Sequence, residues 1–151
     1  MKNIIISTGG SGGHVIPALI LYDHFKEKNN VFLVSDLRGL KFIEKNKYKY
    51  QILNVRNISS NILFFPFFLL NFIFVIIKSY FILKKNKIDI LISTGGYMSL
   101  PLNIASSIYR TKLLLFEPNL VIGRSNKYCL RFAKNIICYS NKIKNFPENQ
   151  K

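Results

Sequence analysis

Cysteine and acidic residues are both scarce in this sequence of 151 residues. The two cysteines, Cys129 and Cys138, have the spacing of neither a metal site nor a redox pair, so we expect buried free thiols and no metal centre. Seven Asp and Glu against 22 Lys and Arg give a net charge of +15. Such a chain suits nucleic acid, an anionic membrane surface or a phosphorylated ligand. Because there is no Arg-rich stripe and no nucleic-acid-binding motif, nucleic acid is the weakest of the three.

The N-terminus also lacks the pattern of a signal peptide. The apolar run Ile4–Ile6 is too short for the hydrophobic region of such a peptide, and a glycine-rich stretch follows at once. We therefore expect a protein of the cytoplasmic side, with reduced thiols. Hydrophobic residues make up 49% of the chain, which argues against disorder, and its length suits one domain with a real core.

Short β-branched runs alternate with amphipathic segments along the chain. We expect strands at 3–7, 31–35, 50–55, 88–93, 112–116 and 135–139, and helices at 14–28, 37–45, 62–85, 100–109 and 123–133. This order predicts the α/β class, as a doubly wound parallel sheet of the Rossmann-like kind. We expect one domain over residues 1–140 and a linker or tail over 141–151, where the sequence becomes polar.

A glycine-rich turn follows the first expected strand. Gly9, Gly10, Gly12 and Gly13 surround Ser11 and lead into a helix. Glycines let the backbone approach an anion closely, and the amides of a helix N-terminus point at it, so a phosphate or diphosphate is the expected guest. The turn is neither a P-loop nor the dinucleotide fingerprint.

Two residues near this turn suggest further functions for it. His14 follows the glycines, where a neutral imidazole is suited to act as a general base toward a sugar hydroxyl; simple helix capping is the alternative. Asp36 ends the second expected strand and could bind a ribose, which leaves a minor NAD-binding interpretation open.

Two further turns carry polar or glycine residues after expected strands. Gly95, Gly96 and Tyr97 follow the fourth strand, before a helix with Pro101 in its first turn. Two glycine-rich turns on one sheet edge suggest a ligand with more than one phosphate, or with a phosphate and a polar sugar. After the fifth strand, the sequence offers hydrogen-bonding groups for hydroxyls or amides, or simply an Asx turn. These groups are Glu117, Asn119 and Asn126.

Taken together, these motifs resemble glycosyltransferase family 28. The family opens with a strand and a glycine-rich loop that ends in His, as here at residues 9–14, and has a later Gly-Gly-Tyr loop, as at 95–97. A Glu-x-Asn element followed by Gly and Asn matches Glu117, Asn119, Gly123 and Asn126. The third motif departs from the usual His-Glu-Gln-Asn, since Phe116 and Pro118 replace the His and the Gln.

The resemblance implies the N-terminal half of a two-domain GT-B enzyme. That half would bind a lipid-linked diphospho-muramoyl-pentapeptide acceptor (lipid I), on the cytoplasmic face of a bacterial inner membrane. UDP-GlcNAc would bind a C-terminal domain or a separate chain, for an inverting transfer in peptidoglycan synthesis that needs no cofactor. The resemblance makes His14 the base. It assigns the diphosphate contacts to Gly10, Ser11, Gly12, Gly13, Gly95, Gly96 and Tyr97.

The stretch from Asn57 to Ile77 has no charged residue, and seven phenylalanines lie between Phe64 and Phe81. This is too many for one helix face, so we favour membrane contact over simple burial, with basic flanks facing an anionic surface. A crossing would put the first three and last three strands on opposite sides of the bilayer, so we expect surface insertion. The expected contact residues are Phe64, Phe67, Phe68 and Phe72.

Two other functions remain open at this stage. The chain could be the membrane-docking subunit of a split glycosyltransferase, or a non-catalytic module that binds a polyprenyl-diphosphate sugar. A downstream reading frame that encodes a UDP-binding domain would separate these from the leading interpretation.

Overall fold

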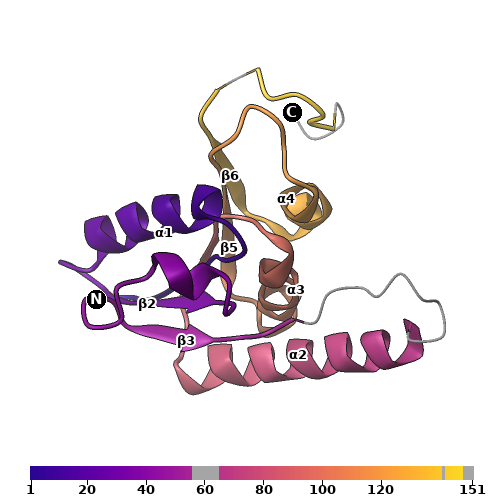
Figure 1. Cartoon of the computed structure of the whole chain (residues 1–151), viewed down its shortest axis with the longest axis horizontal. Helices are drawn as coiled ribbons and strands as arrows, with labels where there is room; N and C mark the ends of the chain where they lie inside the picture. The colour runs from indigo at the N-terminus through magenta and orange to yellow at the C-terminus, as the bar shows by residue number, and fades with distance from the viewer. Residues whose placement is uncertain (56–64, 141, 148–151) are drawn as a thin grey trace.

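The computed structural model of the chain describes residues 1–55, 65–140 and 142–147, and shows strands alternating with helices (Figure 1). The strands are β1 (Asn3–Ser7), β2 (Asn30–Ser35), β3 (Tyr50–Ile52), β4 (Ile90–Ser93), β5 (Lys112–Glu117) and β6 (Asn135–Cys138). The α-helices are α1 (Gly12–Phe25), α2 (Phe65–Lys85), α3 (Leu100–Tyr109) and α4 (Arg124–Cys129). Short 3-10 turns are η1 (Gly39–Phe42), η3 (Tyr97–Ser99) and η4 (Leu130–Phe132).

All six strands pair in parallel in one sheet, in the order β3-β2-β1-β4-β5-β6. The chain winds outward in one direction from β1 and then, after β3, returns to the other side of β1 through α2. This confirms the predicted doubly wound α/β sheet. The strand order reverses between β1 and β4, and ligands of such sheets bind beyond the carboxyl ends of the strands at this reversal.

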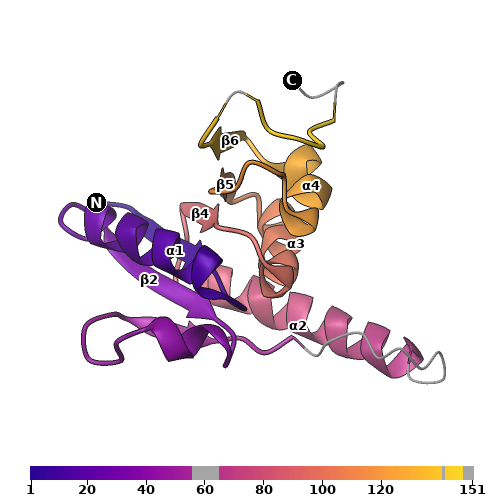
Figure 2. The same cartoon turned by 45° about the horizontal axis from the view of Figure 1, so that its top comes forward.

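Alternation along the strands builds a separate core on each face of the sheet. Ile5 faces one core together with buried side chains of α2 and α3, such as Leu83 and Leu102. Its neighbours Ile4 and Ile6 face the opposite core, under α1. Successive strand residues point to opposite faces, so a strand covered on both sides is apolar throughout. Figure 2 shows α1 on one side of the sheet and α2 and α3 on the other.

One predicted helix is wrong. The segment 37–45 forms only the turn η1, which the Asp36 carboxylate begins by accepting the Gly39 amide. The turn goes no further because Ile43 is extended, with φ of −106° and ψ of 118°, and its side chain is buried in the core under α1. The other elements lie close to their predictions, although β3 ends at Ile52 rather than at residue 55. The last described residues pack back onto the domain, since Lys144 bridges with Val121. A domain boundary near 140 stays a prediction.

Helix α2 is the one helix in the described part of the chain that is long and apolar enough to cross a membrane, and only 22% of its most apolar window is buried. The sheet forbids a single crossing, however. Strands β1 and β4 precede and follow α2 in sequence and hydrogen-bond directly to each other, with Ile5 beside Leu91. The two strands must therefore lie on the same side of any bilayer. This agrees with the topological argument made from the sequence.

Candidate functional site at the junction of two glycine loops

The glycine-rich loops after β1 and β4 touch each other at the point where the strand order reverses. A Cβ atom on Gly96 would lie only 3.0 Å from the carbonyl oxygen of Gly9. Gly96 also has φ of 85°, in the left-handed region that favours glycine. Glycine is therefore required here both by the backbone conformation and by the approach of the other loop.

The side chain of His14 connects the two loops. Its Nδ1 lies 2.8 Å from the carbonyl oxygen of Thr94, the residue that precedes Gly95. A carbonyl oxygen only accepts hydrogen bonds, so Nδ1 carries a proton, and in the neutral ring Nε2 is left with a lone pair. The imidazole is thus oriented with a proton acceptor at its other nitrogen, as a general base requires.

Asp36 holds the first loop in place. Its carboxylate accepts the amides of Gly10 and Gly39 and the Nε of Arg38, each at 2.9 Å. Burial alone would raise the pKa of Asp36, but the hydrogen bonds from Gly10, Gly39 and Arg38 outweigh it and hold the pKa below the usual 3.8. Because this buried carboxylate bonds to its own chain, the ribose-binding role on which the NAD interpretation depended has no support.

The same contacts define which amides of the first loop remain for a ligand. The Gly10 amide donates to the Asp36 carboxylate, and the Ser11 amide donates to the Gly9 carbonyl oxygen. Gly12 and Gly13 begin α1, where the first amides of a helix have no partner within it. Among the first-loop amides predicted to contact a diphosphate, those of Gly12 and Gly13 are therefore the ones left to donate.

A buried polar cluster supports the second loop. The Ser99 hydroxyl donates to the Gly96 carbonyl at 2.7 Å and lies 3.0 Å from the hydroxyl of Ser125 in α4. Behind the loop, the Asn103 amide donates to the hydroxyl of Ser93, at 3.1 Å. These bonds fix the loop between β4, α3 and α4. None of these serines was singled out from the sequence, because isolated serines carry no distinctive spacing.

Glu117 organises the turn after β5. It is fully buried, and one oxygen accepts the backbone and side-chain amides of Asn119, at 3.1 and 2.9 Å. The other accepts the Gly123 amide at 2.8 Å and the Asn126 side chain at 3.0 Å. Four donors occupy the carboxylate, so in this geometry it positions neighbouring groups. The sequence suggested that Glu117 contacts the acceptor substrate directly, but both of its carboxylate oxygens are already occupied by these hydrogen bonds.

Asn126 lies against the second loop. A Cβ atom on Gly95 would come within 3.4 Å of its side-chain nitrogen and within 3.2 Å of the His14 ring, so Gly95 separates the two side chains. The buried oxygen of the Asn126 amide has no partner among the described residues, nor has the hydroxyl of Thr8 at the end of β1. Unpaired buried polar atoms are uncommon, and here they cluster around the loop junction.

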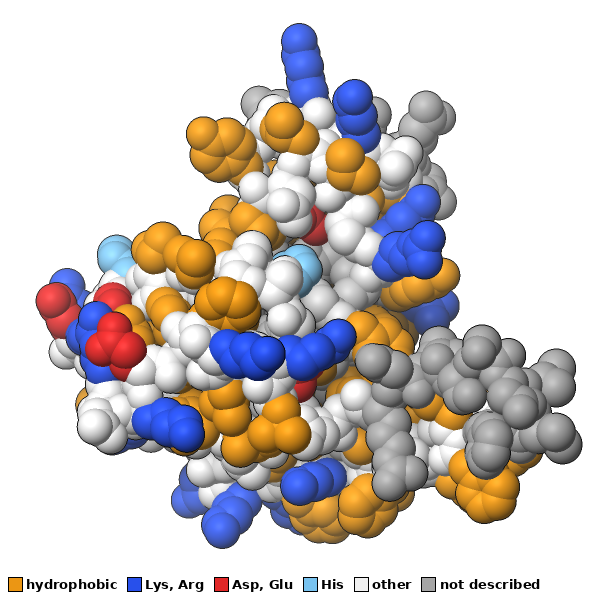
Figure 3. All heavy atoms as spheres, viewed as in Figure 1, with side chains coloured by type: hydrophobic (Ala, Val, Ile, Leu, Met, Phe, Trp, Pro, Cys, Tyr) orange, Lys and Arg blue, Asp and Glu red, His pale blue; other side chains and the backbone are white. Residues whose placement is uncertain are grey.

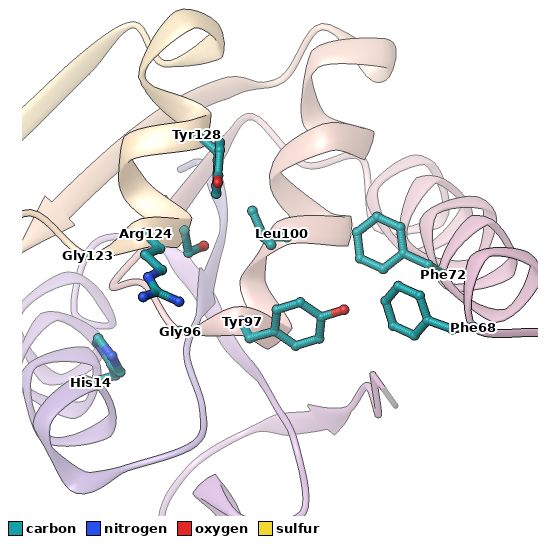
Figure 4. Close-up of a pocket in the computed structure, with 10 residues that line it drawn as sticks. His14, Phe68, Phe72, Gly96, Tyr97, Leu100, Gly123, Arg124 and Tyr128 are labelled. Carbon is teal, nitrogen blue, oxygen red and sulfur yellow. The ribbon is translucent and has the colours of Figure 1, made fainter. Parts of the chain in front are cut away.

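A pocket of about 620 Å³ opens beside this junction (Figure 4). Its polar side includes His14 and Gly96 from the predicted set, and its other side is apolar. The Tyr97 ring lies between them, and burial raises the pKa of the Tyr97 hydroxyl, which keeps it neutral. The complete lining is His14, Phe68, Phe72, Gly96, Tyr97, Leu100, Gly123, Arg124, Ser125 and Tyr128.

Arg124 is the functional candidate that sequence reasoning passed over. Its guanidinium lies in the pocket near His14 in Figure 4, and within the described chain no carboxylate lies at ion-pair distance from it. The available signal was a basic residue directly after Gly123, in a turn already marked as polar. Because the chain has 22 Lys and Arg, one more basic residue in a turn did not stand out as a site residue.

The phenylalanines of α2 divide between two faces. Phe68 and Phe72 are half-buried and line the pocket, where the Phe72 ring stands 6.4 Å from that of Tyr97. The prediction that these two side chains point outward to a membrane therefore needs correction. Phe67 is 69% exposed, as expected of a membrane contact, and Phe64 lies outside the described residues.

Comparison with known proteins gives one family. The profile of the glycosyltransferase family 28 N-terminal domain matches residues 4–138. The chain is 57% identical over 146 residues to a protein of Pelagibacter ubique, and 35% identical over 150 residues to one of Rickettsia prowazekii. Both are named UDP-N-acetylglucosamine--N-acetylmuramyl-(pentapeptide) pyrophosphoryl-undecaprenol N-acetylglucosamine transferase. The matches cover 97% and 98% of this chain but only 41% and 38% of those proteins.

Solved structures agree on the fold. The crystal structure of Acinetobacter baumannii MurG matches with a TM-score of 0.83 at 21% identity, over 97% of this chain and 43% of that one. A UDP-GlcNAc 2-epimerase from Methanocaldococcus jannaschii matches with a TM-score of 0.68 at 16% identity, over 96% of this chain and 41% of that one. The sheet is thus the N-terminal half of a GT-B fold, and the chain belongs to glycosyltransferase family 28.

Proposed function

We propose that this chain is the acceptor-binding half of an N-acetylglucosaminyltransferase that acts on a polyprenyl-diphosphate-linked muramoyl-pentapeptide. The names of its relatives supply the reaction and the substrate class. The donor, UDP-GlcNAc, would be held by a C-terminal domain or by a separate chain, since this chain spans about two fifths of those relatives. No nucleic acid is involved in this proposal.

The observation that carries the proposal is the junction of the two glycine loops around His14. The unpaired amides of Gly12 and Gly13 and the guanidinium of Arg124 are suited to the negative charge of a diphosphate. The loops bring these groups to the reversal point of the sheet, where ligands of this fold class bind. An acceptor held there by its diphosphate would place its sugar near the imidazole.

The proposed chemistry at His14 is general base catalysis. As the acceptor hydroxyl attacks the anomeric carbon of the donor sugar, Nε2 takes the hydroxyl proton, the new glycosidic bond forms, and UDP leaves with the electron pair of the broken bond. The Thr94 carbonyl holds the Nδ1 proton and stabilises the imidazolium that results. Attack opposite the leaving group inverts the anomeric carbon.

We further propose that the chain lies on the cytoplasmic face of an anionic membrane. Along α2, side chains spaced three, four and seven residues apart are exposed and apolar: Phe67 69%, Leu70 65%, Phe74 63% and Phe81 59%. In Figure 3, apolar side chains gather along the edge where α2 lies, and basic side chains lie near them. This face would enter the lipid interface while the basic residues attract anionic headgroups.

Calorimetric titration of the purified chain would test the acceptor assignment. A soluble analogue with a short prenyl chain on diphospho-muramoyl-pentapeptide should bind saturably, whereas UDP-GlcNAc should not bind at micromolar concentrations. Saturable donor binding with no acceptor binding would show that the domain has been assigned to the wrong substrate.

A further inference from the structure

The pocket beside the loop junction has two chemically different ends. Arg124, His14 and the backbone of Gly96 form one end, Phe68 and Phe72 form the other, and Leu100 lies between them, as Figure 4 shows. A ligand that fits both ends has an anionic group next to an apolar chain. The diphosphate-linked end of a prenyl chain has this character.

We propose that this pocket is a subsite for the first isoprene units of the acceptor lipid, with Arg124 paired to the adjoining diphosphate. The inference builds on the proposed function and specifies which part of the acceptor the pocket takes. It assigns to Arg124 and to the aromatic wall a role in selecting prenyl diphosphates over other diphosphates.

Arg124 supports the anionic end of this proposal. Among the residues that line the pocket it is the one with a permanent charge, and it is exposed there. Neither ion pair found in the described chain involves it; these are Asp23 with Lys26 and Asp36 with Arg38. A guanidinium without a carboxylate partner keeps its planar set of donors available, and this set matches phosphate oxygens in pairs.

A continuous aromatic surface supports the apolar end. The Phe68 and Phe72 rings are stacked at 5.9 Å, and the Phe72 and Tyr97 rings follow at 6.4 Å, so the surface runs from α2 to the second glycine loop. The same helix exposes Phe67 and Leu70 on its outer face. A chain leaving the pocket past Phe68 would therefore meet the side of α2 that we place in the lipid interface.

The size of the pocket sets how much of the acceptor it can enclose. Its volume of about 620 Å³ lies within the range of small-molecule sites, about 300–1,000 Å³. Neither an undecaprenyl chain nor a muramoyl-pentapeptide fits into such a volume, so the pocket takes only a part of the acceptor. The sugar and peptide need many polar partners, and the wall of Phe68, Phe72 and Leu100 supplies none from its side chains. The proximal isoprene units match the wall.

The test compares three probes by calorimetric titration of this chain: neryl diphosphate, methyl diphosphate and inorganic pyrophosphate. We expect neryl diphosphate to bind at least about tenfold more tightly than the other two, because burying an isoprene unit adds apolar contact. R124Q should weaken all three by about tenfold, with partial recovery in R124K, because pairing with the phosphate depends on the cation. Equal affinity for the three probes would overturn the proposal.

Two variants address the apolar wall. F72A should weaken neryl diphosphate by about tenfold or more and leave methyl diphosphate unchanged. Tyr128 lies outside the wall of Phe68, Phe72 and Leu100 but lines the same pocket, so Y128A should also weaken neryl diphosphate; because Tyr128 is 69% exposed, this variant carries little risk to the fold. The matched control is Y139A, since Tyr139 is 83% exposed and does not line the pocket. A loss in Y139A equal to that in Y128A would contradict a specific prenyl subsite.

A last comparison separates this inference from the proposed function. Two acceptor analogues carry the same diphospho-muramoyl-pentapeptide, one with a neryl group and one with a methyl group. If both bind equally and F72A affects neither, the prenyl subsite is wrong while the acceptor assignment stands. If neither analogue binds but neryl diphosphate does, the acceptor assignment fails and the prenyl diphosphate site is retained.

Discussion

The Nδ1 atom of His14 lies 2.8 Å from the carbonyl oxygen of Thr94, so the second glycine loop holds the imidazole that follows the first. The two residues stand 80 positions apart in the sequence. This bond determines the tautomer of the proposed base, and it makes the position of His14 depend on how the loop after β4 is folded.

The first prediction concerns the protonation of His14. We expect the neutral ring to carry its proton on Nδ1, because the Thr94 carbonyl can only accept. Long-range proton–nitrogen correlation spectra of histidine-labelled protein would measure this, with H24Q used to assign the two rings. The exposed His24 serves as the internal reference. A neutral ring with its proton on Nε2 would contradict the proposed orientation of the base.

A second prediction separates two glycines of the same site. G96A should destabilise the chain by about 1–3 kcal/mol, because φ of 85° with ψ of 151° is a backbone conformation that essentially only glycine adopts. Its Cβ would also press on the Gly9 carbonyl. G13A is the matched control: Gly13 lies in α1, and a Cβ there meets nothing closer than 3.7 Å. It should be neutral or up to about 1 kcal/mol more stable. Urea unfolding of both variants checks the pair, and equal losses would count against a special backbone at Gly96.

The third prediction concerns acid. The pKa of Asp36 is lower in the folded chain than its ordinary 3.8, so its stabilisation is complete above about that pH. This contribution to the free energy of unfolding is lost as the pH falls from about 3.8 through the lower pKa that Asp36 has in the folded chain. D36N should therefore differ most from the parent protein near pH 6 and converge toward it near pH 3. Urea unfolding across this interval measures the difference, with E27Q at an exposed position as control. A constant difference at all pH values would contradict the role of the Asp36 charge.

The fourth prediction concerns α2. Replacing Phe67, Leu70 and Phe74 with serine should lower binding to anionic vesicles by about a hundredfold or more, because each buried apolar side chain contributes about 1.5–3 kcal/mol. Salt should weaken attachment only in part, since it screens the lysines and leaves the apolar contact. The triple variant of Ile16, Ile20 and Ile108, which are similarly exposed on α1 and α3, is the control. An equal loss of vesicle binding in both triple variants would contradict the role of α2 as the docking element.

Some of the site could be read directly from the sequence. The strands, the two glycine loops and His14 were located correctly because each loop follows an apolar strand, and parallel strands place such loops at one edge of the sheet. The family pattern in residues 9–14 and 95–97 added the proposed chemistry. These features are local, since a strand and the turn after it are specified by adjacent residues.

Only the tertiary structure decided which groups face the ligand. Asp36 and Glu117 look like ligand-binding acids in the sequence, but each carboxylate accepts hydrogen bonds from amides of its own chain. Phe68 and Phe72 belong to a run of similar residues, and the packing of α2 against α3 is what turns them toward Tyr97. Arg124 reaches the pocket because α4 packs against α3 and the turn η3. Such outcomes depend on contacts between segments far apart in the chain, and the spacing of neighbouring residues does not encode them.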